Sequence, residues 1–482
     1  MTSRSAKRGR FDFPVIDSDG HTIEFVPALF DILDKVAGPK VVERYRASFE
    51  QGMFGWYDLS HAERMHTRRA RPPWWAGTQN TVDRATATLP SLLYERMEEI
   101  GLDFAVLYPS VTLLAPDYPD EELRRAACRA ANLYHAEFYG EYRDRMATVA
   151  VIPMHTPEEA ITELDFAVGE LGLKAVMMAG SIRRPIPAAV EISPEAAQYS
   201  YWIDTLGIDS AHDYDPVWQR CVELGVSPTF HSSSMTWGSR GSVSNYVYNH
   251  IGAFGSANEG TCRSLFLSGV TRRFPTLRFG FLEGGVGWAC SLYSDLVSHW
   301  EKRGLANIRQ YDPTTIDESK LLELFKSYGS KLFREGRDRL MGEIGLHTTP
   351  EDMDHLDEFE ACGIETAADI KELFTERFYF GCEADDPINA WAFNDKLNPM
   401  GARLRAMFSS DIGHWDVPDM TRVTDEAYEL VEHGHLDADA FRDFMFGYPA
   451  EFWTAANPEF FKGTAVEGEV SKFLGAGSTP AG

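Results

Sequence analysis

The chain has 482 residues, of which 44% are hydrophobic and 12% aromatic, so it can bury a large core. Its 73 Asp and Glu residues outnumber its 46 Lys and Arg residues and give a net charge of −27. This charge repels phosphate backbones and anionic bilayers, so we expect neither a nucleic-acid partner nor a membrane partner.

The cysteines and the chain ends indicate a cytoplasmic protein. Six cysteines are scattered without a CxxC pair, which is typical of reduced thiols. The basic N-terminus lacks the apolar run of a signal peptide, and no apolar stretch reaches the ~18 residues of a membrane span. We expect residues 1–10 and 470–482 to be disordered and residues 11–460 to form one domain.

Short apolar runs alternate with amphipathic helical stretches along this domain. The runs cover residues 13–19, 102–110, 147–154, 173–180, 226–233, 277–285, 377–384 and 405–411. Continuous apolar strands separated by helices are typical of a parallel sheet that is covered on both faces. Eight of them predict an α/β fold, the (β/α)8 TIM barrel.

Two insertions interrupt the repeat, at about residues 37–92 and 300–375. The first is rich in aromatics, Arg and Pro, and includes "PPWW" with Trp74 and Trp75; the second is helical and charged. Long loops in compact domains often close over a site, so we expect both insertions to form a cap over the C-terminal mouth, with Trp74 or Trp75 against the substrate. Simple packing of "PPWW" on the barrel is an equally good interpretation.

Acidic residues and histidines directly follow four of the apolar runs. The carboxyl ends of barrel strands meet at one mouth, so these side chains should converge there. One such residue alone would be interpreted as a cap, but burying the whole group without cations would be very unfavourable. The pattern therefore predicts a metal site that includes Asp19, His21, His231, Glu283 and Asp411.

Three other groups after the strands have two interpretations each. Arg183 and Arg184, after the fourth run, could bind a substrate carboxylate or phosphate, or form a solvated pair. His250 on a helix after the fifth run is interpreted as packed, although it could face the mouth. Glu383 and its acidic neighbours after the seventh run are interpreted as loop caps.

The motifs resemble the amidohydrolase superfamily, in particular its decarboxylase-like, amidohydrolase-related group. Asp19 and His21 in "DSDGH" match the first-strand ligand pair, and His231 in "TFHSSS" matches the fifth-strand histidine. Asp411 and His414 in "SDIGH" match the eighth-strand "SDxPH". The resemblance implies metal-dependent hydrolysis or non-oxidative decarboxylation of a small molecule, and a homodimer.

Departures from that family motif change the expected chemistry. Glu283 stands where the family has a sixth-strand histidine, Asp19 stands where histidine is commonest, and Glu24 follows soon after His21. The expected ligand set is Asp19, His21, Glu24, His231, Glu283 and Asp411. Four carboxylates and two histidines exceed one ion and predict two Fe ions, with Zn or Mn as the alternative. His414 is a further catalytic candidate, and Asp17 is expected to orient a ligand.

In its carboxylate enrichment the chain is similar to the non-haem diiron monooxygenases of platensimycin and platencin biosynthesis. That similarity implies O2 as co-substrate, an external electron donor, and hydroxylation of a bulky apolar small molecule, such as a terpenoid or its thioester, in secondary metabolism. The alternative is a metal-dependent hydrolase or decarboxylase in which Glu283 transfers a proton. A binding protein on an inactive barrel is disfavoured because the expected ligands are all present.

Overall fold

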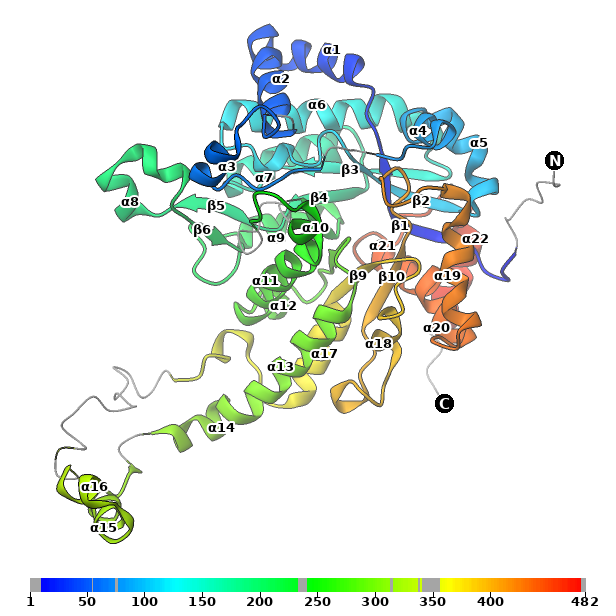
Figure 1. Ribbon diagram of the computed structural model, residues 1–482. Coiled ribbons are helices and arrows are strands. Elements are labelled where there is room, and N and C mark those ends of the chain that lie inside the picture. Colours follow the sequence, from blue (N-terminus) through cyan, green and yellow to red (C-terminus); the bar gives the residue numbers. More distant parts are fainter. Residues whose placement is uncertain are drawn as a thin grey trace.

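The computed structural model describes residues 10–53, 55–73, 77–232, 241–312, 315–336, 339 and 356–477. Its centre is an eight-stranded parallel sheet in the order β1-β2-β3-β4-β7-β8-β9-β10 (Figure 1). The strands are β1 Ile16–Thr22, β2 Phe104–Pro109, β3 Met146–Ile152, β4 Ala175–Ala179, β7 Pro228–Ser232, β8 Phe279–Phe281, β9 Phe378–Glu383 and β10 Arg405–Ser409. All eight predicted strands are confirmed.

The first and last strands meet and turn this sheet into a nearly closed barrel. The Asp411 amide donates to the Asp19 carbonyl at 2.9 Å, and the His21 amide donates to the Ile412 carbonyl at 2.7 Å. Both bonds lie beside Asp19, His21 and Asp411, which are predicted site residues. With helices between its strands, the sheet forms the predicted (β/α)8 TIM barrel.

Helices surround the barrel in two groups. Those before β7 are α1 Val26–Ala37, α2 Pro39–Met53, α3 His61–Thr67, α4 Thr81–Thr88, α5 Pro90–Ile100, α6 Glu121–Tyr139, α7 Pro157–Leu164, α8 Pro187–Ile192 and α9 Asp215–Leu224. Those after β7 are α10 Tyr246–His250, α11 Ala253–Leu267, α12 Val270–Arg273, α13 Gly287–Arg303, α14 Leu305–Ile308, α15 Glu318–Tyr328, α16 Lys331–Gly336, α17 Ala367–Arg377, α18 Asn389–Phe393, α19 Val423–Glu432, α20 Ala438–Arg442, α21 Tyr448–Ala456 and α22 Glu467–Gly477.

The first insertion reaches the barrel mouth, as predicted. The Thr78 amide donates to the Gly413 carbonyl beyond β10 at 3.3 Å, and the Arg71 amide donates to the Ser242 carbonyl before α10 at 2.9 Å. Arg71 and Thr78 therefore each contact a loop that follows a barrel strand. Trp74 and Trp75 lie outside the described residues, so their contact with substrate stays a prediction.

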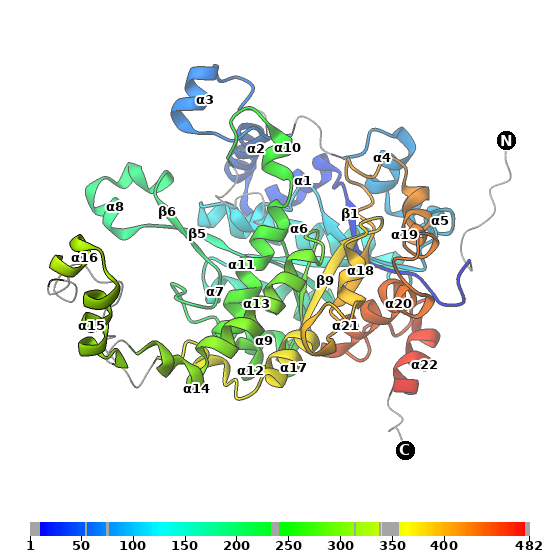
Figure 2. The same ribbon diagram turned by 60° about the horizontal axis from the view of Figure 1, so that its bottom comes forward.

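The second insertion does not cap the mouth, and that part of the prediction is wrong for the described residues. Helices α15 and α16 have no buried side chains and project away from the barrel as an arm (Figures 1 and 2). The cause lies in α13, which starts at the mouth directly after β8 and returns the chain toward the opposite end. An insertion that begins after Arg303 therefore starts far from the site.

Four further features bear on the sequence predictions. A hairpin of β5 Ile182–Pro185 and β6 Tyr201–Asp204 extends from the β4 end, where we expected only loops. The expected disorder from residue 470 is wrong up to residue 477, because Val470 is buried and anchors α22. All six cysteines are buried and unpaired. Among the described helices none is long and apolar enough to cross a membrane.

Two glycines allow a test of the mouth closure. Gly413 has φ +100°, and a Cβ on it would lie 2.7 Å from the His21 carbonyl oxygen; Gly434 has φ +73° with open space around it. Gly434→Ala should cost only the left-handed conformation, about 1–2 kcal/mol. Gly413→Ala should cost about 1–3 kcal/mol more, because β1 and β10 must separate. Thermal unfolding measures both, and equal melting temperatures would contradict this account.

Candidate metal centre

Side chains from β1 and β7 meet at one point of the barrel mouth. His21 Nε2 lies 3.0 Å from His231 Nε2, and each of these nitrogens lies 3.5 Å from Asp19 Oδ1. All three side chains are buried. A cation that binds its donors at about 2.0–2.2 Å holds neighbouring donors about 3.0–3.5 Å apart, so this set has the spacing of ligands around one ion.

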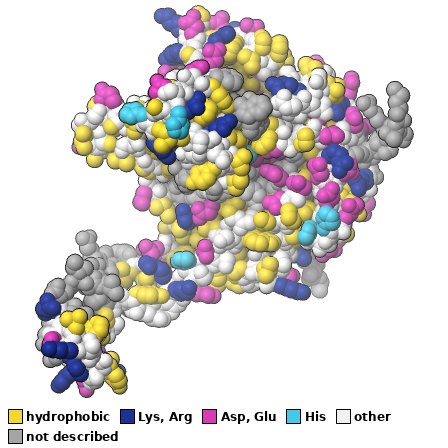
Figure 3. Space-filling model, viewed as in Figure 1, with side chains coloured by type: hydrophobic (Ala, Val, Ile, Leu, Met, Phe, Trp, Pro, Cys, Tyr) yellow, Lys and Arg dark blue, Asp and Glu magenta, His cyan; other side chains and the backbone are white. Residues whose placement is uncertain are grey.

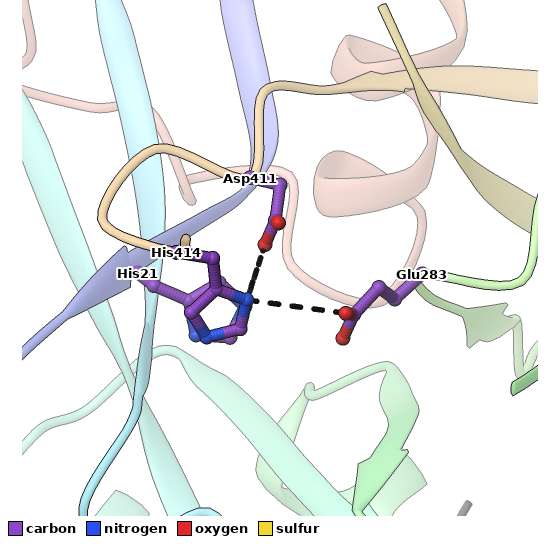
Figure 4. A group of neighbouring side chains, drawn as sticks. All are labelled: His21, Glu283, Asp411 and His414. Carbon is purple, nitrogen blue, oxygen red and sulfur yellow. Dashed lines mark ion pairs between the residues drawn. The ribbon is translucent and has the colours of Figure 1, made fainter. Parts of the chain in front are cut away.

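A second set lies beside the first and comes from the loops after β8 and β10. Asp411 Oδ1 lies 3.4 Å from His21 Nε2 and 2.7 Å from His414 Nδ1. Glu283 Oε1 lies 3.9 Å from the same His414 nitrogen. Figure 4 shows both carboxylates directed at His414, whose ring stacks on His21 with centroids 3.6 Å apart.

Glu283 connects the two sets. Its Oε2 lies 3.1 Å from His231 Nε2, while its Oε1 faces His414. One imidazole nitrogen has one lone pair and serves one ion, so His21 cannot complete both sets. The six donors therefore divide into Asp19, His21 and His231 on one side and Asp411, His414 and Glu283 on the other, and Asp411 also lies beside His21 of the first set. This arrangement fits two cations with Glu283 as a bridge.

The buried charge of these sets also fits cations. Oδ1 of Asp19, Oδ1 of Asp411 and Oε2 of Glu283 are buried without any hydrogen bond. Burial first, and then neighbouring carboxylates, raise the pKa of all three groups well above its usual value. Burial lowers the pKa of His21, and lowers that of His231 to about 3, so both imidazoles are neutral, as metal ligands must be.

The local backbone holds two of the carboxylates in an uncommon conformation. Glu283 has φ +54° and Asp411 has φ +51°, both in the left-handed region that non-glycine residues rarely adopt. Each directly follows a buried strand, and the turn aims its side chain back over the barrel mouth. Such strain costs on the order of 1–3 kcal/mol and is commonly found at functional sites.

Asp17 positions the strand ends and does not join the donors. Its carboxylate accepts from the Ser410 amide at 2.9 Å, from the Ser410 hydroxyl at 2.5 Å and from the Asp19 amide at 3.2 Å. Burial raises its pKa to about 6, against these hydrogen bonds. Asp17 thus joins β1 to β10 beside Asp19 and Asp411. Its predicted role in orienting a metal ligand stays a prediction.

Glu24 is not a ligand, and the sequence prediction for it is wrong. Its carboxylate accepts from the backbone amides of Ser110, Val111 and Thr112 at 2.8–3.1 Å and from the Thr112 hydroxyl at 2.6 Å. These four bonds use its acceptor capacity. Glu24 follows the end of β1, so it fixes the loop after β2 instead of facing the mouth.

A cavity of about 330 Å³ opens beside Glu283. Its lining includes His250, Phe254 and Trp415 together with the carboxylates of Glu283, Glu383, Asp386 and Asp416. Glu383 was interpreted as a loop cap, but it ends β9 and lines this cavity; its position at a strand end was the available signal. The Glu383 side chain is partly exposed, and desolvation of its carboxylate, followed by the charge of Asp416, raises its pKa to about 7. His250 faces the cavity, the less favoured of its two interpretations.

The two arginines predicted to bind substrate have different surroundings. Arg184 pairs with Asp204 at 2.8 Å and donates to the His155 carbonyl and the Tyr214 hydroxyl, so it holds the β5–β6 hairpin on the barrel. Arg183 is exposed, and its guanidinium lies 4.7 Å from the centre of the Tyr201 ring. Of the two, only Arg183 has an exposed side chain.

Comparison with known proteins gives a family and a fold. The amidohydrolase family model matches residues 102–341. None of the curated proteins compared with the chain matches it. The matched range includes β2, β3, β4, β7 and β8 of the barrel and leaves out β1, β9 and β10.

Three solved structures illustrate the likeness. An amidohydrolase from Mycobacterium avium subsp. paratuberculosis K-10 is 16% identical with a TM-score of 0.50, over 92% of this chain and 98% of the other. A dihydroxybenzoic acid decarboxylase from Polaromonas sp. JS666 with bound manganese is 16% identical, with a TM-score of 0.48 and coverages of 93% and 99%. A 5-carboxyvanillate decarboxylase from Novosphingobium aromaticivorans DSM 12444 with manganese is 13% identical, with a TM-score of 0.48 and coverages of 94% and 100%. At this identity the first likeness supports the fold alone.

The division of donors predicts a graded loss of metal. Wild-type protein should carry about two ions per chain, and His231→Ala or His414→Ala should each remove about one, because each empties one set. Asp411→Ala should remove both, since Asp411 contacts both His21 and His414. Elemental analysis after gel filtration measures the content.

Glu24→Gln is the matched control for these ligand variants. It changes one buried carboxylate near the same mouth and should retain the wild-type metal content, because Glu24 faces the loop after β2. Loss of an ion from Glu24→Gln, or full occupancy in Asp411→Ala, would show that the donors are assigned wrongly.

Proposed function

Because this chain belongs to the amidohydrolase superfamily, we propose that it is a metal-dependent hydrolase that cleaves a substrate whose reacting carbonyl end is small and uncharged. The observation that supports this most directly is Glu283, whose two oxygens face two neighbouring donor sets at the barrel mouth. Glu283 also lines the 330 Å³ cavity, so a molecule bound there would lie against the centre.

The chain supplies its own proton carrier next to this centre. Divalent ions bound by the donor sets would polarise a carbonyl group and lower the pKa of a water. Glu383 lines the cavity with Glu283, and its pKa of about 7 lets it accept a proton near neutral pH and return it to the leaving group. The proton-transfer role predicted for Glu283 therefore passes to Glu383.

The charge of the cavity selects among substrates. Four carboxylates line it, and Asp19 and Asp411 lie behind Glu283. An anionic carboxylate, as non-oxidative decarboxylation requires, would meet repulsion from Glu383, Asp386 and Asp416, which are not among the donors that the divalent ions would neutralise. A bulky apolar substrate would fit poorly in 330 Å³ lined by charged groups. A compact neutral ester, amide or lactone meets neither obstacle.

An O2-dependent diiron reaction is the second candidate. Three carboxylates among six donors form a hard, oxygen-rich ligand set, which suits iron as well as zinc or manganese. The ligand set supports iron as one possible metal, but it does not favour an O2-dependent reaction over hydrolysis. The homodimer expected from the family resemblance and the external electron donor expected for an oxygenase remain predictions.

Two glutamate variants separate ligand from proton carrier. Glu283→Gln should lose about one ion per chain, because the amide is a poor bridge between two cations. Glu383→Gln should keep both ions and lose turnover by about 100-fold or more, because the amide cannot accept the proton. In the wild type, turnover should fall as the pH drops to about 7 or below, since Glu383 must be deprotonated and nearby cations favour its charged form. Metal content and pH–rate profiles together decide the assignment, and full activity in Glu383→Gln would refute it.

The reaction class is tested by changing the metal and the gas phase. Protein loaded with Zn²⁺ or Mn²⁺ should hydrolyse members of a panel of small esters, amides and lactones equally fast under argon and in air. Asp411→Ala serves as the metal-free control and should be inactive. Oxygen uptake confined to the Fe²⁺-loaded protein, without hydrolysis by any metal form, would favour the oxygenase instead.

A further inference from the structure

A second, larger cavity lies outside the metal centre, between the first insertion and the β5–β6 hairpin. Its volume is about 1470 Å³, and its walls come from α2, α3, the hairpin and the segment that leads into α10. Among the described residues that line it are Arg68, Arg69, Arg183 and His66, and none is an Asp or Glu. We refer to it as the outer cavity and to the 330 Å³ space beside Glu283 as the inner cavity.

The absence of carboxylates from the described lining is unusual for this chain. The whole sequence holds 73 acidic residues against 46 Lys and Arg, so a typical stretch of its surface is acidic. Figure 3 shows Arg and His side chains grouped near the α3 region of the viewed face. The outer cavity is therefore a local cationic site on an anionic protein, and it attracts negative ligands that the remaining surface repels.

The arginines of the outer cavity are held ready to bind. Arg69 donates to the Gln51 carbonyl, which fixes its guanidinium at the cavity wall. Within the described part of the chain Arg68 forms no ion pair and donates only to the Met65 sulfur, at 3.7 Å. Arg68 also has φ +53°, at the end of α3. Positioned guanidinium groups are the preferred partners of phosphate oxygens.

Aromatic rings stand beside these charges. Tyr199 is 66% exposed and Tyr248 58% exposed, and both line the outer cavity together with Tyr201, which faces Arg183. Large aromatic side chains with most of their surface in water are candidates for covering a planar ring of a ligand. The outer cavity thus combines phosphate-binding groups with stacking surfaces.

Helix α10 separates the two cavities. Tyr248 lines the outer cavity and His250, two residues later, lines the inner one. Arg71 joins α10 to the first insertion, because its backbone carbonyl accepts from Asn249 Nδ2 at 3.1 Å and its side chain donates to the Ser244 carbonyl at 2.9 Å. The linings of the two cavities therefore come within two residues of each other on α10.

We propose that the outer cavity binds the phosphate-bearing end of the substrate, whose uncharged carbonyl end reacts in the inner cavity. This inference rests on the proposed hydrolase function and adds the chemical class of the remote group. It also explains how an acidic protein with an acidic inner cavity can accept a substrate of net negative charge. The charged end is bound by arginines well away from the carboxylates.

Calorimetric titration with AMP and inorganic phosphate tests the proposal without any turnover. The metal-loaded protein should bind AMP saturably, and Arg68→Ala and Arg183→Met should each weaken binding by about tenfold, the effect of one charge-assisted hydrogen bond. Arg68→Lys should lose less, since it keeps the charge. Phosphate should bind more weakly than AMP if the tyrosines stack on the base, and Tyr248→Ala should remove that difference.

Two controls keep the outcome decisive. Arg125→Ala removes the same charge from exposed α6, where Arg125 pairs with Glu121, and should leave AMP binding unchanged. Asp411→Ala, which empties the metal centre, should also keep AMP binding, so that failure of the hydrolase proposal and failure of this inference remain distinguishable. The absence of saturable AMP binding, an equal loss in Arg125→Ala, or dependence of binding on the metal centre would each overturn the inference.

Discussion

The repulsion among buried carboxylates at the barrel mouth is the constraint on which the rest of the structure depends. The side chains of Asp19, Glu283 and Asp411 converge, and each has one carboxylate oxygen that is buried and accepts no hydrogen bond. Without counter-charge this arrangement would be too unfavourable to persist as three anions. Proton uptake relieves it, as their raised pKa values indicate, and divalent cations relieve it while leaving the carboxylates charged. The neutral imidazoles of His21 and His231 then act as ligands and add no competing positive charge.

The scaffold keeps this group together through backbone bonds that do not involve the donors' side chains. Asp17 bonds Ser410, and the backbones of β1 and β10 exchange two further hydrogen bonds beside Asp19 and His21. These bonds close the barrel at the level of the metal centre. Any opening of the mouth would therefore also separate the donor side chains. The left-handed backbone of Glu283 and Asp411 is tolerated because the closed barrel fixes both strand ends.

The eight strands and most of the donors could be predicted because both follow from short-range patterns. An apolar run identifies a barrel strand, and the polar residue that ends it lies at the mouth wherever the barrel closes. The same pattern wrongly predicted Glu24 as a ligand, because Glu24 lies beyond the end of β1. It also missed Glu383 as a cavity residue, because acidic residues are so common in this chain that Glu383 was interpreted as a loop cap. Neither the direction of the arm after α13 nor the β5–β6 hairpin could be predicted, since both depend on tertiary packing. The outer cavity is lined by segments more than 100 residues apart in the sequence, so no local sequence pattern could predict it.

Separation of charge between the two cavities follows from the way the barrel is built. The strand ends must supply carboxylates to hold cations, so the inner cavity is acidic whatever its substrate. The first insertion and the hairpin are free of that requirement, and there the described lining carries arginines and no acids. A ligand that is neutral at one end and anionic at the other lies lowest in energy in one orientation only, because reversing it would place phosphate beside Glu283 and leave the arginines unpaired. Electrostatics alone would thus set which bond of the substrate reaches the centre.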